Sequence, residues 1–148
     1  MAYSTDIDLE NRRSGILQLL PNGARQQRTL AEEELLADLE RIWYRPAATA
    51  RCVDWMQQRF DSARVDPAEL KRLSVLKTLV YAHEFLMKYG GAEADGFERH
   101  RDFYEREYQA ELRKALDAGL AYDWPNAGGA AGSADDRPAP APRLLERA

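Results

Sequence analysis

Apolar side chains recur at helical spacing in two long stretches of the second half of the chain. The first stretch begins with three helix-start signals, because Asp66 can cap a helix, Pro67 fits a first turn and Glu69 follows the cap by three residues. Gly90-Gly91 ends the stretch. One stripe of the predicted helix consists of Leu70, Leu73, Leu76, Val80 and Met87.

The second stretch begins after Asp95-Gly96 and ends before Gly119. Each of the two helices has roughly 23 residues, or about 35 Å at 1.5 Å per residue. Two long helices joined by a short glycine-containing loop pack as an antiparallel hairpin. We therefore predict an all-α fold, a small helical bundle dominated by this hairpin. The stripe of the second helix consists of Phe97, Tyr104, Tyr108, Leu112, Ala115 and Leu116.

Two shorter helices are expected nearer the N-terminus. The first is capped by Thr5 or Asp6 and runs for about two turns. Thr29 and Glu32 have the spacing of a capping box, which predicts the start of the second. The acidic run that contains Glu32 would then favour a helix N-terminus electrostatically. Pro46 is expected to stop this helix.

A further helix is expected over residues 47–60, where apolar side chains lie on roughly one helical face. The only cysteine of the chain, Cys52, falls within it and is interpreted as a buried, inert thiol. Residues 120–124 are the best candidate for a strand.

The composition changes at Pro125, after which the chain reads NAGGAAGSADDRPAPAPRLLERA. Such a segment buries too little apolar surface to offset the entropy of ordering it, so alone in water it is expected to be disordered. We therefore predict a helical body over residues 1–124 and a Gly/Ala/Pro-rich extended C-terminal arm over residues 125–148. The arm can reach roughly 75 Å when extended, and Leu144-Leu145 is its natural anchor.

The charge pattern argues against a protein that grips nucleic acid. The formal net charge is -4, from 21 basic and 25 acidic residues whose signs alternate, whereas DNA binders usually carry a basic stripe. A ring of subunits can still surround DNA without gripping it. No apolar run approaches the roughly 20 residues that cross a bilayer, and the N-terminus lacks the apolar centre of a signal peptide. We expect a soluble intracellular protein without a membrane partner.

The polar residues do not form a recognisable catalytic, cofactor-binding or metal-binding motif. His83 precedes Glu84 as in a zinc-binding HExxH helix, but the second histidine position is Met87. His83 is therefore interpreted as a partly buried helix residue. Tyr104 and Tyr108 lie one turn apart and suit either a platform for stacking bases or a packed core, and the lack of interleaved basic residues favours the core.

Four sequence elements resemble the head-to-tail connector, or adaptor, proteins of tailed bacteriophages and gene transfer agents. They are YSTDIDLE near the N-terminus, DPAELKRL at the start of one long helix, FERHRDFYEREYQAELRKAL in the other, and the exit GLAYDW. The tyrosine-rich helix that ends in this exit is the most distinctive of them. The resemblance covers about residues 4–124.

The resemblance implies a structural protein of the virion, with no enzymatic activity and no cofactor. It implies a ring of twelve copies that sits beneath the portal protein, in which each adaptor contacts its neighbouring subunits. A tail-side connector or tail protein would bind the other face of the ring, and DNA would pass through as non-specific cargo. The protein would be found at the head-tail interface, and in the host cytoplasm during assembly.

The helix exit and the arm hold the candidate partner contacts, which are Tyr122, Asp123, Trp124, Arg143, Leu144, Leu145 and Arg147. An alternative function remains open, namely an intracellular helical interaction or regulatory protein with a disordered tail. Its size in solution and its absence from purified virions would distinguish it from a connector.

Overall fold

The computed structural model describes residues 2–125, and these residues form helices without a named strand. The all-α helical bundle is thereby confirmed. The elements are α1 (Asp6–Arg12), α2 (Ile16–Leu19), α3 (Arg25–Asp38), η1 (Leu39–Tyr44), α4 (Arg45–Ala50), η2 (Ser62–Arg64), α5 (Pro67–Tyr89), η3 (Gly91–Glu93) and α6 (Ala94–Ala118).

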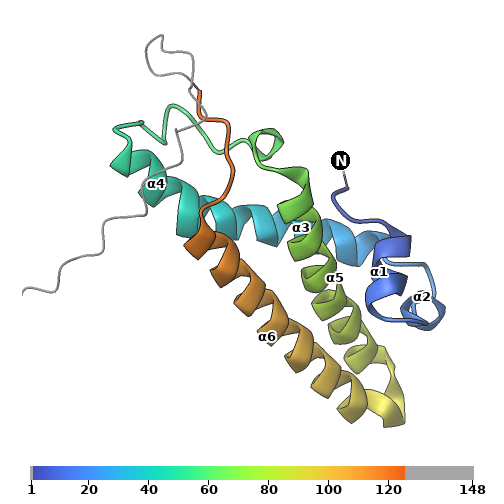
Figure 1. The fold of residues 1–148 in the computed structure, drawn as a ribbon. Coiled ribbons are helices and arrows are strands. Elements are labelled where there is room, and N and C mark those ends of the chain that lie inside the picture. The colour runs from blue at the N-terminus through green and yellow to red at the C-terminus, as the bar shows by residue number, and fades with distance from the viewer. Residues whose placement is uncertain (1, 126–148) are drawn as a thin grey trace, which may run out of the picture.

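Helices α5 and α6 form the predicted antiparallel hairpin, which dominates the view in Figure 1. The Asp66 side chain caps α5 by accepting a hydrogen bond from the Ala68 amide at 3.0 Å. Gly90 ends α5 where α6 packs closely, since a Cβ atom there would lie 2.7 Å from the Phe97 ring. The start and stop signals of α5 and the stop of α6 before Gly119 were therefore interpreted correctly, whereas α6 already begins at Ala94 and includes Asp95-Gly96.

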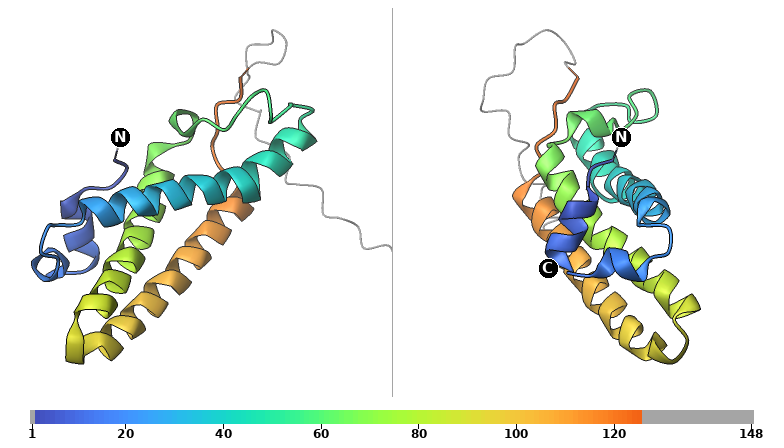
Figure 2. Two further views of the ribbon diagram at one scale, coloured as in Figure 1. Left: turned by 180° about the vertical axis from the view of Figure 1, so that it is seen from behind. Right: turned by 90° about the vertical axis from the view of Figure 1, so that its right-hand side faces the viewer.

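Helices α3, η1 and α4 follow one another as a single rod that crosses the hairpin (Figures 1 and 2). The predicted start at Thr29 is wrong, because the rod begins at Arg25 and the Thr29 hydroxyl donates to the Arg25 carbonyl at 3.0 Å from inside the helix. The predicted stop at Pro46 is also wrong. A π-helix precedes Pro46, and the residue lies in the first turn of α4, where its missing N–H is tolerated.

The predicted helix over residues 47–60 ends early, at Ala50. Two hydrogen bonds close it in the Schellman pattern, from the Cys52 amide to Thr49 O at 3.1 Å and from the Val53 amide to Ala48 O at 2.8 Å. This ending requires the left-handed backbone that Cys52 adopts, with a φ of 58°. Cys52 is exposed, so its interpretation as a buried thiol is wrong.

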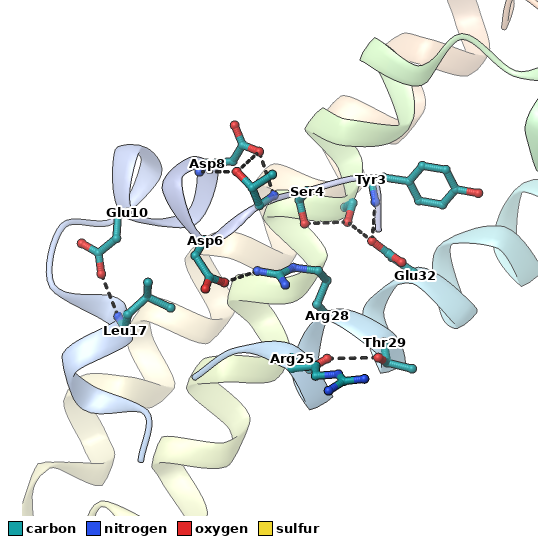
Figure 3. Close-up of polar contacts among 12 residues, drawn as sticks. Tyr3, Ser4, Asp6, Asp8, Glu10, Leu17, Arg25, Arg28, Thr29 and Glu32 are labelled. Atoms are coloured by element: carbon teal, nitrogen blue, oxygen red, sulfur yellow. Dashed lines mark hydrogen bonds and ion pairs between the residues drawn. The ribbon is translucent and has the colours of Figure 1, made fainter. Parts of the chain in front are cut away.

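The N-terminal segment is tied to α3 and α5 by polar contacts (Figure 3). Thr5 caps α1 in a capping box, as one of the two predicted caps. Glu32 lies within α3 instead of at its start, and its carboxylate accepts from the Tyr3 amide at 2.7 Å. The hydroxyls of Ser4 and Ser74 lie 3.1 Å apart and are both buried. The run that contains Glu32 therefore makes tertiary contacts and does not stabilise a helix N-terminus.

The core lies along α5, which is covered by the rod on one side and by α6 on the other (Figure 2). Tyr104 and Tyr108 are buried in it, in agreement with the preferred interpretation of these residues. Within the described part of the chain, no helix is both long and apolar enough to cross a membrane. The fully buried side chains of this core include Leu9, Ile16, Leu35, Leu39, Leu70, Leu73, Leu79, Tyr108 and Leu120.

Candidate functional site

The chain leaves the bundle through a segment that we call the exit strap, residues 119–125. Gly119 adopts a φ of 82°, which turns the chain sharply out of α6. The strap then runs antiparallel to the segment before α5, and a single β-bridge joins Val65 and Tyr122. Of the strand predicted over residues 120–124, the structure thus contains one isolated bridge, at Tyr122. In Figure 1 the orange strap passes from the end of α6 towards the loop that follows α4.

Three hydrogen bonds fasten the strap to this neighbouring segment. The Asp66 amide donates to Ala121 O at 3.2 Å, and the Asp123 amide donates to Arg64 O at 2.9 Å. The Arg64 guanidinium donates in return to Asp123 O at 2.8 Å. These bonds hold the backbone of the strap beside the first turn of α5, so the direction in which the chain leaves the body is fixed.

Five aromatic side chains pack where the strap meets the rod, and we call them the exit cluster: Trp43, Tyr44, Phe60, Tyr122 and Trp124. Tyr44 is 1% exposed and lies at the centre. Its ring stacks on Trp124 with centroids 5.5 Å apart and an angle of 12° between the planes. Tyr122 stacks in turn on Phe60 at 5.9 Å. Each such pair contributes about 0.5–1.5 kcal/mol beyond its buried area.

The two tyrosines of the exit cluster also fix the loop between α4 and η2. The Tyr44 hydroxyl donates to the Gln58 carbonyl, and the Tyr122 hydroxyl accepts from the Asp61 amide at 3.2 Å. Burial raises the pKa of both phenols above the ordinary value, and their mutual proximity raises that of Tyr44 further. Both hydroxyls are therefore neutral at physiological pH, which suits hydrogen bonding and not acid-base chemistry.

Arginine side chains lie over the outer faces of two tryptophans at this end of the molecule. The guanidinium of Arg51 is 4.7 Å from the ring centroid of Trp124, and that of Arg45 is 4.5 Å from Trp55. Such cation-π contacts contribute about 0.5–1 kcal/mol at exposed sites. The indole Nε1 of Trp124 is buried and has no hydrogen-bond partner among residues 2–125. Arginine side chains thus cover part of the aromatic surface at this end of the molecule.

The structure brings together the three candidate contacts at the helix exit. Tyr122 and Trp124 are half-buried and turn their rings into the body, whereas Asp123 is exposed. The two aromatic residues therefore hold the strap in place, and their predicted role in partner binding stays a prediction. The four candidate contacts of the arm, Arg143, Leu144, Leu145 and Arg147, lie outside the described residues.

Sequence reasoning missed the residues on the rod that complete the exit cluster. The sequence alone does not identify Trp43 or Tyr44 as contacts of the strap. Their adjacency was a usable signal, because two neighbouring aromatic residues on a helix rarely share one face. Their partner Trp124 lies far along the chain, and a single sequence does not reveal that pairing.

A second polar cluster surrounds Lys77, which is 5% exposed on α5. Its ammonium lies 3.1 Å from a Glu34 oxygen and 3.4 Å from a Glu105 oxygen, and 4.7 Å from the centre of the Tyr108 ring. Burial opposes ionisation of Glu34, but hydrogen bonds from Tyr81 and Lys77 outweigh it and lower the Glu34 pKa. The cluster is an ion-paired junction of three helices, in which the Lys77 ammonium of α5 lies between carboxylates of α3 and α6.

His83 is fully buried in α5, more deeply than predicted. Its Nδ1 lies 2.7 Å from Leu79 O, which requires a proton on that nitrogen. Its ring packs 5.4 Å from both His100 and Tyr104. Burial lowers the pKa of His83 to about 4, so the ring is neutral in cells. Among the described residues, no group of three or more His, Cys, Asp or Glu side chains is placed to hold a metal ion.

Three comparisons with known proteins gave no match, whether the chain was compared with protein families, with curated proteins or with solved structures.

Proposed function

We propose that this protein is a head-to-tail connector of a tailed bacteriophage or a gene transfer agent, which assembles as a ring beneath the portal and links it to the next tail component. The exit strap is the observation that carries the proposal. Hydrogen bonds to the segment before α5 and the stacked rings of the exit cluster give the arm a fixed point of departure from a helical body. The sequence resemblance of residues 4–124 supplies the family.

A fixed departure point matters for a protein that binds through an arm. When the root of an arm is held, its tip searches only the volume that its length allows, and the effective concentration at a partner site within reach is high. Repeating one modest contact around a ring multiplies this gain. Leu144-Leu145 is the proposed anchor on the portal, and Arg143 and Arg147 are its polar guides.

The charges of the body suit a ring through which DNA passes. The net charge of -4 leaves no excess of positive charge to retain the phosphate backbone. In this proposal DNA is cargo, bound without sequence preference, and the protein partners are the portal, the neighbouring adaptor subunits and a tail-side protein. The protein has a structural role without reaction chemistry or a cofactor.

The test is binding to purified portal by the full chain and by a chain that stops after Pro125. Circular dichroism first establishes that the shortened chain keeps its helix content. We expect the full chain to sediment with the portal and the shortened chain to remain in the supernatant. The double variant Leu144→Ser/Leu145→Ser should behave like the shortened chain, and the matched arm variant Ser133→Ala should bind like the wild type.

Undiminished portal binding by the shortened chain would contradict the role of the arm. Mass spectrometry of purified particles tests the wider proposal, because a connector is present in them at a fixed ratio to portal. A chain that is monomeric or dimeric under all conditions and absent from particles would instead favour the intracellular interaction protein.

A further inference from the structure

A groove of about 730 Å³ opens between α1, α5 and the C-terminal half of α6. Its floor includes Val75 and Leu76, and its rim carries the acidic residues Asp8, Glu69 and Glu111. This volume falls in the range of pockets that bind small ligands. None of the five residues of the exit cluster lines the groove.

The acidic residues of the groove differ in how their charge is balanced. Asp8 pairs with Lys71 at 2.9 Å, and Glu111 pairs with Arg72 at 3.8 Å. Glu69 has no ion pair among residues 2–125, and its Oε2 is buried without a hydrogen-bond partner there. Burial raises the pKa of Glu69, and the nearby carboxylate of Asp66 raises it further. This end of the groove therefore favours a cationic group from outside the described residues.

The exit strap passes this acidic end of the groove near its own start. Ala121 accepts the hydrogen bond of the Asp66 amide, and both Asp66 and Glu69 line the groove. The root of the arm at Pro125 thus lies four residues along the chain from a residue that contacts this end of the groove. Its sequence near position 145 is Arg-Leu-Leu-Glu-Arg, an apolar pair with an arginine on either side.

We propose that the groove is the docking site of the chain's own arm, with Leu144 and Leu145 on the apolar floor and the flanking arginines beside Asp66 and Glu69. The charges are complementary, because neither carboxylate has an ion pair among residues 2–125 and the two flanking residues of the arm are arginines.

The length of the arm allows this docking within one molecule. The groove follows α5 from Asp66 to Leu76, a rise of about 15 Å. Roughly 20 residues separate Pro125 from Leu144, and a flexible chain of that length has a root-mean-square span of about 25 Å. Tethering by such a linker gives an effective concentration in the millimolar range. If the arm binds the groove with a dissociation constant of about 1 mM, the groove would therefore be occupied by the arm of the same chain about half of the time. A free arm peptide at concentrations well below about 1 mM would hardly bind.

Disulfide trapping in the full chain tests the proposal. Cys52 is replaced by serine, and cysteines are introduced as Ala68→Cys in the groove and Glu146→Cys in the arm, which keeps both leucines. The matched control pairs Glu146→Cys with Met56→Cys, because Met56 is 67% exposed in the loop fastened to the exit cluster. Ala68 lies two residues after Asp66, which is bonded to the strap, and Met56 lies in the loop that is bonded to Tyr122 of the strap, so tethering alone predicts similar rates for the two pairs.

We expect the groove pair to form its disulfide within one chain at least about tenfold faster than the control pair, at a rate independent of protein concentration. Adding Glu69→Gln, or Leu144→Ser with Leu145→Ser, should slow the groove pair severalfold and leave the control pair unchanged. Equal rates for the two pairs would overturn the proposal. So would disulfides that form mainly between chains and accelerate with concentration, since the occupant would then be the arm of a second copy.

The proposal does not depend on the connector function, and the experiment contains no portal. A failure of trapping therefore leaves the portal-binding test untouched, and a failure of portal binding leaves the trapping result valid.

Discussion

Replacing Trp124 with alanine tests whether the exit cluster holds the strap. The indole is half-buried and stacks on Tyr44 at 5.5 Å, contacts Tyr122 at 4.9 Å and lies under the guanidinium of Arg51 at 4.7 Å. A fully buried tryptophan costs about 3–5 kcal/mol when cut to alanine, and this one keeps part of its surface in water. Three aromatic pairs, including the one with Trp43 at 5.8 Å, and one cation-π contact together supply about 2–5.5 kcal/mol. We expect a loss of about 2–3 kcal/mol.

Urea unfolding followed by circular dichroism measures this loss, and hydrogen exchange locates it. The Asp123 amide donates to Arg64 O at 2.9 Å, so its exchange should accelerate if the strap detaches. Trp55→Ala is the matched control, because Trp55 is also half-buried but makes one cation-π contact, with Arg45, and no aromatic pair within the described residues. We expect about 1 kcal/mol for it. A loss below about 0.5 kcal/mol for Trp124→Ala, with the Asp123 amide still protected, would refute the reasoning.

Three further substitutions test other parts of the fold. Because the folded-state pKa of His83 is lowered from 6.5 to about 4, the free energy of unfolding should fall by about 3 kcal/mol as the pH drops through that interval. His83→Gln should flatten this dependence on pH, which urea titrations at several pH values would measure. An unchanged slope would contradict the lowered pKa of His83. Gly90→Ala should cost about 1–3 kcal/mol, because the new Cβ would clash with the Leu86 carbonyl oxygen and lie 2.7 Å from the Phe97 ring. Thermal unfolding would measure this cost, and a neutral effect would contradict the close contact of the loop with the end of α5. Cys52→Gly should stabilise the protein by about 0.5–1 kcal/mol, since glycine adopts the φ of 58° without steric cost; a lower melting temperature would argue against that backbone conformation.

The parts of the fold that could be predicted depend on signals only a few residues apart. Asp66, Pro67 and Glu69 define the start of α5 within one turn, and Gly90 defines its end. The capping box at Thr5 is equally local. Because these signals act through neighbouring backbone groups, they can be recognised in a single sequence.

The parts that could not be predicted depend on contacts between distant residues. Thr29 and Glu32 have the spacing of a capping box, yet Glu32 bonds to the Tyr3 amide and Thr29 to the helix itself. Nothing local to the sequence distinguishes these outcomes, because the competing partner comes from another element. The stack of Tyr44 on Trp124 likewise joins the rod to the strap, two segments that the whole hairpin separates along the sequence. The sequence therefore predicted the strap as part of the candidate site, but not the residues of the rod on which the strap packs.

The π-helix η1 also has a consequence for how this chain can change in evolution. A π-turn holds one more residue than an α-turn, so deleting any residue from Leu39 to Tyr44 would return the rod to α-helical spacing. Because one residue fewer would then span the same turn, the side chains after the deletion would keep nearly their present directions about the rod axis. Pro46 would, however, follow a regular α-helical turn, where its ring clashes with the carbonyl group four residues before it. The π-turn and the proline therefore form one unit of inheritance, which related chains would keep or lose together.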